Sequence, residues 1–514
     1  SPLMKLVSRG DTTVVDAYLS PILRRYVEQV AAQMPGVRLF FMQSSGGLTE
    51  AHRFQGKDAI LSGPAGGIVG MVRTAVAAGH PKVIGFDMGG TSTDVSHYAG
   101  EFERAFETQV AGVRMRAPMM SIHTVAAGGG SLLQFDGARL RVGPQSAGAN
   151  PGPASYRRGG PLATTDANVL LGKIQPAWFP RVFGPNADEP LDRDGVVAKF
   201  QALAQQVAQA TGRAATPESL AEGFLQIAIQ NMANAIKRIS VARGYDVTQY
   251  TLQCFGGAGG QHACGVADAL GMTRVFVHPL AGVLSAYGMG LADQIAMREA
   301  AIEQPLGAAG LAEARNRLAV LGQAAADELV AQGVPADAVQ RRERLHLRYA
   351  GTDTALTVDA ADEATARSAF EAAYRQRFAF GMPGRALVIE AVSVEAIAAG
   401  ENHDSAAAGD EPAPQRATPD ATVRMHSGTW HDAALHVREQ LPPGARVDGP
   451  AVIADRNATT VVEPGWQAQH LRSGALVLQR VQARATAHAI GTDADPVMLE
   501  VFNNLFMNIA EQMG

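Results

Sequence analysis

Cysteine is nearly absent from this sequence, which has only Cys254 and Cys264 in 514 residues. Two cysteines without CxxC spacing exclude a disulfide-stabilised scaffold and fit a reducing compartment, so the cytoplasm is the expected location. An excess of positive charge is also missing, because 44 Lys and Arg stand against 49 Asp and Glu. A chain without such an excess lacks the electrostatic footprint of a nucleic-acid-binding protein. We therefore expect neither disulfides nor a nucleic-acid partner.

Long apolar runs are missing as well. The longest covers residues 68–78, is interrupted by Arg73, and is shorter than the ~20 residues that a membrane-spanning helix needs. The N-terminus has no signal-peptide pattern. With 46% hydrophobic and 18% charged residues, the composition excludes disorder and coiled coil. The sequence predicts a soluble protein without membrane contact, and its length predicts about three domains.

Glycine, in contrast, is abundant, with 55 residues in the chain against an average of ~7% of residues. Glycine lets backbone N–H groups approach an anion closely, so glycine turns beside strands and helix starts are typical of a nucleotide or polyphosphate cleft. For any single cluster, a turn without a ligand is the alternative. The clusters lie at residues 44–47, 62–67, 89–90, 128–130, 148–160 and 256–260.

The alternation of strands and helices over the first 304 residues predicts a layered α/β domain. A long helix is expected from Pro217, which suits a first helical turn, to Gly244, which can end it. The other expected strands lie at 37–42, 83–87, 250–255 and 274–278, and the other helices at 66–78 and 262–270.

The later part of the chain has a different pattern. A smaller α+β module is expected over 305–400, and short strands separated by Pro-Gly turns predict a small β domain over 421–480. Residues 401–420 and about 481–495 are expected to be linkers. An amphipathic helix at 496–514 either packs back on the body or begins a further domain. In the module, helices are expected at 311–332 and 364–378, and strands at 345–358 and 387–397.

The most specific chemical motif lies at residues 83–96, where a strand is followed by a Gly-Gly-Thr turn and then by alternating residues. This pattern predicts a β-hairpin. Its backbone N–H groups and hydroxyls suit phosphates, and its carboxylates suit a Mg²⁺ ion that keeps several waters. A solvated turn is the alternative, but it requires neither two Thr nor two Asp. We expect Gly89, Gly90, Thr91 and Thr93 at the phosphates, Asp87 and Asp94 as catalytic residues, and Asp87 at the metal.

Two common nucleotide motifs do not match. A P-loop is excluded because Gly172-Lys173 is followed by Ile174 instead of Ser or Thr. The unit at 254–270 fails as a dinucleotide fingerprint, because His262 stands where Gly or Ala is required and the next strand has no acidic residue for a ribose. A glycine bend before a helix still suits adenosine or the α-phosphate. The residues expected there are Gly256, Gly257, Ala258, Gly259 and Gly260.

The order of these motifs resembles that of the actin-like ATPase superfamily, and residues 1–480 resemble the A half of the hydantoinase/oxoprolinase family. Residues 254–264 with Gly351-Thr352-Asp353 resemble the branch that cleaves 5-oxoproline more than the hydantoinases, in which Pro-Leu is expected in place of Gly260-Gln261. The other matching strings are at 62–67, 126–131, 142–148, 151–153, 165–168 and 449–453.

The resemblance implies an α/β fold with an actin-like ATPase (ribonuclease H-like) core over residues 1–304. It also implies that this core is incomplete at its N-terminus, since relatives carry a first phosphate motif in an earlier segment. Residues 496–514 resemble the opening of a B half, so the chain is expected to be an internal piece of a longer polypeptide, inactive alone. A homo-oligomer is expected.

The implied reaction is ATP-dependent cleavage of the lactam of 5-oxo-L-proline to L-glutamate, with ATP and Mg²⁺ as cofactors. This chain would bind ATP and phosphorylate the lactam oxygen, and the B half would complete ring opening. Alternatives are an N-methylhydantoinase, the A-type subunit of an acetone- or acetophenone-type carboxylase, and a non-enzymatic actin-like regulator. The cyclic amide is expected to contact Gly128, Gly129 and Gly130.

Other polar residues carry weaker predictions. Cys254 and Cys264 are interpreted as buried small residues in preference to ligands or nucleophiles. His123 and Asp166 could contact the lactam, but a core histidine and a helix-capping aspartate are preferred. Ser155 stands where relatives often have Cys, which argues against a nucleophile there.

Overall fold

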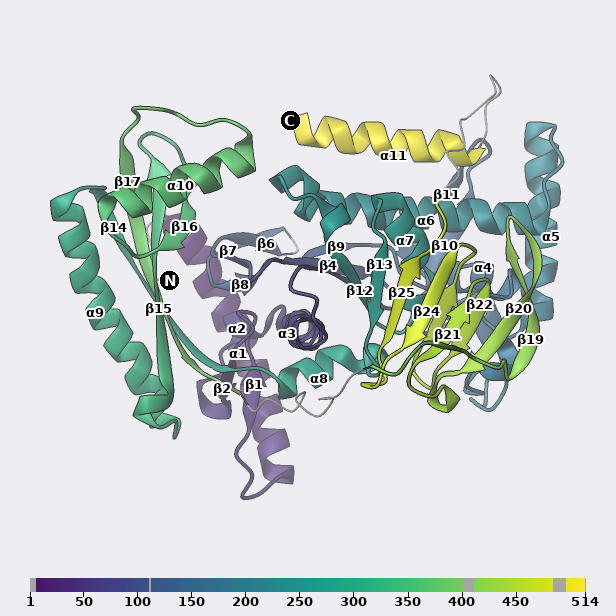
Figure 1. Cartoon of the computed structure of the whole chain (residues 1–514), viewed down its shortest axis with the longest axis horizontal. Coiled ribbons are helices and arrows are strands. Elements are labelled where there is room, and N and C mark those ends of the chain that lie inside the picture. Colours follow the sequence, from purple (N-terminus) through teal and green to yellow (C-terminus); the bar gives the residue numbers. More distant parts are fainter. Residues whose placement is uncertain (1–5, 111, 401–410, 484–495, 514) are drawn as a thin grey trace.

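The structure is a computed structural model that describes residues 6–110, 112–400, 411–483 and 496–513. Its centre is a nine-stranded sheet in the order β18-β21-β24-β25-β13-β12-β3-β4-β9 (Figure 1). β3, β12 and β13 run parallel, whereas β4 and β25 pair antiparallel with β3 and β13. The bounds are β3 Val83–Met88, β4 Thr93–Tyr98, β9 His123–Val125, β12 Thr251–Phe255, β13 Arg274–Val277, β18 Gln415–Arg416, β21 Ala445–Asp448, β24 Trp466–His470 and β25 Leu476–Arg480.

Helices cover both faces of this sheet. α3 (Ser62–Ala77) packs against β3 and α8 (Leu284–Gly290), whereas α6 (Pro217–Ile239) packs on β4, β9 and α7 (Ala263–Leu270). Figure 1 shows α3 and α8 on one side of the sheet and α6 on the other. β12 is buried along its whole length, as expected for a parallel strand covered on both faces. The predicted layered α/β domain is therefore present.

The long helix α6 begins where the sequence predicts. Thr216 caps it by accepting a backbone N–H of the first turn, and Pro217 occupies the first position. The predicted end at Gly244 is wrong, because the helix stops at Ile239. Ser240 leaves the helical conformation, and Gly244, with φ of 83°, instead closes the following 3₁₀ turn.

A second, six-stranded sheet has the order β1-β2-β14-β17-β15-β16 and is covered by α9 and α10. The single strand predicted at 345–358 is wrong. It is the β15–β16 hairpin, in which Gly351, with φ of 80°, lies in the turn between the strands. The bounds are β1 Phe40–Met42, β2 Leu48–Glu50, β14 Gln294–Pro305, α9 Ala308–Ala331, β15 Val339–Tyr349, β16 Leu356–Asp359, α10 Glu363–Phe378 and β17 Leu387–Ala398.

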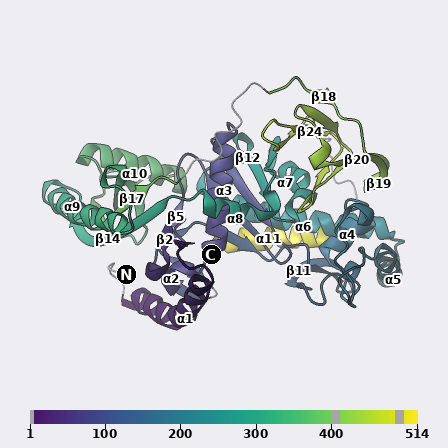
Figure 2. The same ribbon diagram turned by 90° about the horizontal axis from the view of Figure 1, so that it is seen from below.

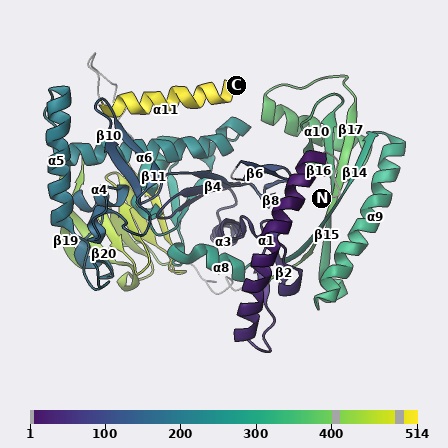
Figure 3. The ribbon, with the colours of Figure 1, turned by 180° about the vertical axis from the view of Figure 1, so that it is seen from behind.

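Strand pairing does not follow two of the expected domain boundaries. β14 ends at Pro305 but pairs along its length with β17, and β1 and β2 belong to the same sheet, so the boundary at 304/305 cuts through the six-stranded sheet. Figure 3 shows α1 (Leu6–Gln33), which packs against α2 (Gly56–Ala59) and β7 (Val113–Met115). Backbone pairing between distant segments, invisible to local sequence patterns, is the reason for the difference.

The region expected as a small β domain is divided between two sheets. β21, β24 and β25 extend the nine-stranded sheet, and β19, β20, β22 and β23 form a four-stranded sheet. Residues 421–480 therefore share a sheet with the core. Of the expected linkers, 401–410 and 484–495 lie outside the described residues. The bounds are β19 Ala421–Ser427, β20 Thr429–Val437, β22 Ala451–Ala454 and β23 Thr459–Val462.

The C-terminal helix α11 (Pro496–Met513) lies along α6 (Figure 1). The Asn504 side chain donates to Asn231 Oδ1 at 3.1 Å, and Glu500 forms an ion pair with Arg139 at 3.2 Å. Of the two interpretations of this segment, packing back on the body describes its position. Within the described ranges, no helix has the length and apolar character needed to cross a bilayer.

Candidate active site

Two carboxylates lie at the base of the turn formed by residues 89–92, between β3 and β4. The two strands pair in a register that places Asp87 directly opposite Asp94. Directly opposed residues of an antiparallel pair lie on the same face, with Cβ atoms ~5 Å apart. Both carboxylates are partly buried, whereas Gly90 and Thr91 at the tip of the turn are exposed. The predicted hairpin is confirmed, and it pairs its two aspartates.

The surroundings of this pair disfavour negative charge. Burial and the neighbouring Asp94 charge raise the pKa of Asp87 to about 7, against a hydrogen bond with Ser285 that lowers it. Burial also raises the pKa of Asp94, against a hydrogen bond that Thr124 donates at 2.6 Å. Among the described groups that shift these two pKa values there is no lysine or arginine. A bound cation would supply the missing positive charge.

The three glycine segments that the sequence singled out separately lie together. The Gly129 N–H donates to the Gly89 carbonyl at 3.1 Å, and the Gly130 N–H donates to the Gly90 carbonyl at 2.6 Å. From the third segment, the Ala258 N–H donates to the Met88 carbonyl at 3.0 Å. The 89–92 turn is therefore supported from two sides by backbone hydrogen bonds.

The role expected for residues 128–130 changes in the structure. Gly128, Gly129 and Gly130 are buried behind the 89–92 turn. A methyl group added at Gly128 would lie 2.6 Å from the backbone carbonyl carbon of Thr91. Glycine is needed here because two backbones touch, so these residues support the turn and are not exposed to a cyclic amide.

The two threonines of the hairpin differ in the same way. Thr93 is completely buried, and its hydroxyl donates to the Ala127 carbonyl. Thr91 is exposed at the tip of the turn. Thr91 is therefore available to a phosphate, whereas the Thr93 hydroxyl is engaged in holding the hairpin to the segment behind it.

The 256–260 bend also divides into packed and open positions. Gly256 has φ of 80°, and a methyl group there would lie 2.5 Å from Asp87 Oδ1. Methyl groups at Gly259 and Gly260 would lie 2.8 Å from the Cys254 sulfur and 2.5 Å from the Thr459 carbonyl oxygen. Gly257 is exposed, with its nearest neighbour 3.7 Å away. Of the bend's four glycines, Gly257 is the one open to a ligand.

Helix α4 (Thr164–Leu170) links the glycine segments, a function that the sequence analysis missed. The Thr165 hydroxyl donates to the Gly129 carbonyl at 2.9 Å, and the Asn168 amide donates to Gln261 Oε1 at 3.0 Å. In the sequence, the one sign of this contact was that residues 165–168 and 254–264 both belong to the strings that resemble the hydantoinase/oxoprolinase family. α4 therefore holds the segment behind the turn and the end of the bend.

Asp166 on the same helix has the structural role that the sequence analysis preferred. Its side chain is fully buried and accepts the backbone N–H groups of Ala154, Ser155 and Ala163 at 2.8–2.9 Å. Because Ala163 precedes the helix, this is a capping interaction extended to a neighbouring loop. Ser155, which belongs to this loop, is itself fully buried.

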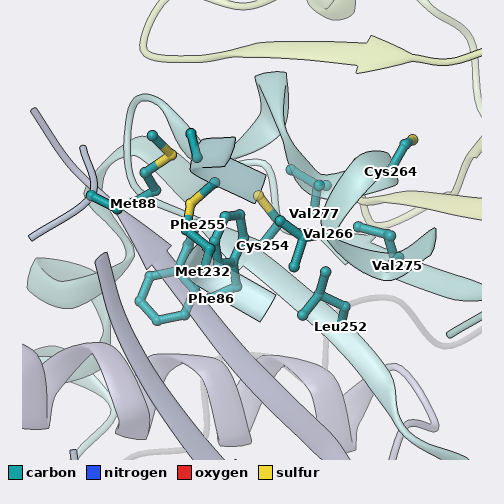
Figure 4. Close-up of a cluster of buried hydrophobic side chains, with 14 of the residues drawn as sticks. Phe86, Met88, Met232, Leu252, Cys254, Phe255, Cys264, Val266, Val275 and Val277 are labelled. Atoms are coloured by element: carbon teal, nitrogen blue, oxygen red, sulfur yellow. The ribbon is translucent and has the colours of Figure 1, made fainter. Parts of the chain in front are cut away.

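The remaining candidates are structural as well. Cys254 and Cys264 are buried free thiols whose pKa values are raised by burial, as the preferred interpretation predicts. Figure 4 shows both side chains among the apolar residues of the core. His123 precedes Thr124 on β9, and successive residues of a strand point to opposite faces. Thr124, not His123, reaches Asp94.

Two residues at the carboxylate pair were not predicted. Thr124 and Ser285 each contribute one hydroxyl, from β9 and α8. No sequence pattern marked either residue, because a single hydroxyl far from the motif carries no spacing signal. They join the three glycine segments and α4 at this site.

Three cavities of the described residues have no residue of the 89–92 turn or the 256–260 bend in their lining. A cavity of about 570 Å³ separates the core from the six-stranded sheet and is lined by charged residues that include Arg116, Arg243 and Glu103. Glu103 follows β4 at the end of the hairpin remote from the 89–92 turn. Gly90, Thr91 and Gly257 are instead exposed on the surface.

Comparisons with known proteins agree with the arrangement of these motifs. The family model described as hydantoinase/oxoprolinase matches residues 9–298, and that of the hydantoinase/oxoprolinase C-terminal domain matches residues 308–472. The chain is 40% identical to "5-oxoprolinase 1" of Arabidopsis thaliana and 38% identical to "5-oxoprolinase" of Dictyostelium discoideum, over all of its own length and 42% of each relative.

A solved structure is similar over most of the chain. The ATP-dependent caprolactamase of Pseudomonas jessenii superposes with a TM-score of 0.82 at 27% sequence identity, covering 94% of this chain and 71% of that one. The present chain spans less than half the length of the two 5-oxoprolinases described above, since it covers 42% of each. On the family-model matches and these identities, the chain belongs to the hydantoinase/oxoprolinase family.

Proposed function

We propose that this chain is the ATP-binding and phosphoryl-transfer part of an ATP-dependent 5-oxoprolinase, which cleaves the lactam of 5-oxo-L-proline to L-glutamate. The observation that carries the proposal is the Asp87–Asp94 pair below an exposed turn of glycine and threonine. Identities of 38–40% to 5-oxoprolinases along the whole chain support the choice of substrate.

The chemistry explains why ATP is required. A lactam carbonyl is stabilised by resonance and resists water. Transfer of the γ-phosphoryl group to the lactam oxygen, with ADP leaving, makes that oxygen part of a leaving group. Water then attacks the ring carbon, the C–N bond breaks, the ring nitrogen takes a proton, and a second water releases phosphate. Catalysis of phosphoryl transfer depends mainly on positioning and on charge stabilisation.

The residues have separate roles in this scheme. The Gly90 backbone N–H and the Thr91 hydroxyl bind the β- and γ-phosphates, whereas the Gly89 N–H donates to the Ser92 carbonyl at 3.0 Å and closes the turn. Gly257 lets the adenosine side of the nucleotide approach the 256–260 bend. Residues 128–130, Thr93 and the other residues of the bend hold these groups in place through the contacts described above.

Magnesium fits the carboxylate pair. Asp87 and Asp94 are oxygen ligands of the kind that Mg²⁺ prefers, and the raised pKa values of both carboxyls indicate a site short of positive charge. No cluster of three or more His, Cys, Asp or Glu suited to a metal occurs in the described part of the chain. Asp87 and Asp94 would therefore hold the ion together with water and phosphate. When bound, the ion neutralises charge that develops on the phosphoryl group.

The remaining proposals concern the whole protein. An actin-like ATPase core is proposed from the order of the motifs, similarity to an ATP-dependent caprolactamase supports the use of ATP, and the length of the relatives supports a B-half partner for ring opening. Cytoplasmic location and homo-oligomerisation remain predictions. The expected units 1–304, 305–400, 421–480 and 496–514 are proposed as domains, although strand pairing crosses two of their boundaries.

The test is ADP release by the full-length protein that carries this chain, with 5-oxoproline, caprolactam, hydantoins and ketones as separate acceptors. We expect 5-oxoproline to stimulate ATP hydrolysis most, with glutamate formed in equal amount to ADP. Stimulation by a hydantoin or by a ketone with bicarbonate would assign one of the alternative reactions. ATP binding without turnover for any acceptor would indicate a regulator and contradict the proposal.

A further inference from the structure

α3 and α8 cross with their backbones in contact. A methyl group added at Gly66 would lie 2.7 Å from the Ser285 carbonyl oxygen, and one at Gly70 would lie 2.7 Å from the Leu284 carbonyl oxygen. From the other side, a methyl group at Gly288 would lie 1.9 Å from the Gly66 carbonyl oxygen. Only glycine allows so close an approach, so the two helices are held in one relative position. Figure 2 shows them side by side.

This crossing brings the Ser285 side chain to Asp87. The Ser285 hydroxyl hydrogen-bonds to the Asp87 carboxyl. A methyl group added at Gly67 would lie 2.9 Å from Ser285 Oγ and 3.6 Å from Asp87 Oδ2, so both groups border the point that Gly67 leaves empty. Oδ1, the other oxygen of Asp87, faces Gly256.

Two other neighbours of Asp87, Asp94 and Cys254, cannot position its carboxyl in the way that the Ser285 hydroxyl does. Asp94 carries the same charge and repels the carboxylate. Cys254 is a fully buried thiol that burial keeps neutral. Within the described residues, Ser285 is therefore the one hydrogen-bond donor acting on the Asp87 carboxyl.

We propose that Ser285 is a positioning residue for Asp87: the glycine crossing of α3 and α8 holds its hydroxyl against the carboxyl and fixes the orientation in which Asp87 meets the hydrated cation. This inference rests on the proposed function, because it requires Asp87 to bind that cation. It also gives a physical reason for the Ser-Gly-Pro-Ala-Gly-Gly string at 62–67, in which Gly66 and Gly67 make the approach possible.

The first experiment measures cation binding without turnover. Mn²⁺ replaces Mg²⁺ in the full-length protein with ATP, and binding is followed by electron paramagnetic resonance. Ser285→Ala should raise the Mn²⁺ dissociation constant about tenfold, the effect of losing one hydrogen bond to a charged group. Ser285→Thr keeps a hydroxyl and should bind Mn²⁺ with a dissociation constant within about twofold of wild type. If Ser285 acted only through its size, the larger threonine would not restore binding.

A matched control separates this effect from the loss of a buried serine in general. Ser96 on β4 is also buried, and its hydroxyl donates a hydrogen bond to the Met71 sulfur at 3.6 Å. Ser96→Ala should leave Mn²⁺ binding unchanged. Equal weakening by Ser285→Ala and Ser96→Ala would overturn the proposal.

A second pair of variants tests the geometry without touching Ser285. Gly67→Ala places a methyl group between Ser285 and Asp87, whereas Gly63→Ala, one turn earlier on α3, adds a methyl group with no neighbour within 4 Å. Gly67→Ala should weaken Mn²⁺ binding, and Gly63→Ala should not. If Ser285→Ala does not fold, this pair decides the question.

Failure of this inference differs from failure of the proposed function. Wild-type Mn²⁺ binding in Ser285→Ala and Gly67→Ala, together with lost binding in Asp87→Asn, would overturn the positioning role alone. Wild-type binding in all three variants would show that Asp87 does not hold the cation, and both proposals would fall.

Discussion

Asp87 and Asp166 are two buried aspartates with opposite surroundings. Asp166 is fully buried and accepts three backbone N–H groups, which counter the rise that burial causes in its pKa. Asp87 lies opposite a second carboxylate, and within the described residues no backbone N–H opposes the rise of its pKa. The fold gives Asp166 three internal donors, whereas Asp87 has the Ser285 hydroxyl and a like charge opposite, so that a bound cation would supply the positive charge that it lacks.

The comparison teaches how to separate structural from functional polar residues in this family member. A buried carboxylate that is saturated with backbone donors stabilises the loops around it. A carboxylate held at a raised pKa beside another carboxylate destabilises the folded chain, a cost that is typical of catalytic sites. Activity and stability should therefore respond in opposite ways to substitution at the two positions.

The largest effect is expected on activity. Asp87→Asn in the full-length protein should lower 5-oxoproline-dependent ATP hydrolysis by about a thousandfold, the upper range for loss of one charge-stabilising group. Folding should be intact, because the substitution is nearly isosteric. Steady-state ADP release and thermal melting measure both. Normal turnover would place Asp87 among the structural residues.

The opposite pattern is expected at Asp166. Asp166→Ala leaves three buried N–H groups without an acceptor and should lower the free energy of unfolding by about 3–5 kcal/mol. Urea denaturation measures the loss. The exposed helix cap Asp362, which accepts the Thr365 N–H, is the control, and Asp362→Ala should cost much less. Equal losses at the two sites would contradict the structural role of Asp166.

The raised pKa of Asp87 should make the stability of the folded chain depend on pH. Its folded-state pKa of about 7 lies above the usual 3.8, so the folded chain binds a proton that the unfolded chain has released between these pH values. Stability should therefore fall as pH rises from about 4 to 7, by on the order of 3 kcal/mol. In Asp87→Asn this component should be absent. Urea melts of both proteins at pH 5 and pH 8, without Mg²⁺, test the difference, and parallel pH profiles would refute it.

The smallest expected effect separates the glycines of the bend. Gly257→Ala adds an exposed methyl group on the open side and should weaken ATP binding about tenfold without changing the melting temperature. Gly259→Ala places its methyl group 2.8 Å from the Cys254 sulfur and should instead lower stability. Nucleotide titration and melting of both variants decide between these outcomes. Unaltered ATP affinity in Gly257→Ala would move adenosine away from the bend.

Much of the fold was predictable because its signals are local. The apolar periodicity of α6 and the hairpin at 83–96 both depend on residues close in sequence, and both are present. The pairing of β14 with β17 was not predictable, because its partners lie about ninety residues apart and each strand alone fits several sheets. The expected domain boundaries rest on local patterns and therefore do not include this nonlocal pairing.

The site was predictable as a set of segments but not as a set of roles. The motifs identified the 89–92 turn, residues 128–130 and the 256–260 bend, which the structure brings together. Sequence does not distinguish an exposed glycine such as Gly257 from one pressed against a backbone such as Gly128. Ser285 left no signal at all, because its role arises from a helix crossing.

Hydrogen exchange of the full-length protein with and without Mg·ATP tests the central claim most directly, since it locates the nucleotide without requiring turnover. We expect Mg·ATP to slow amide exchange in peptides that cover residues 88–92 and 256–260, and to leave residues 101–107 at the charged cavity unchanged. Protection confined to 101–107, with unchanged exchange at both glycine segments, would contradict the account.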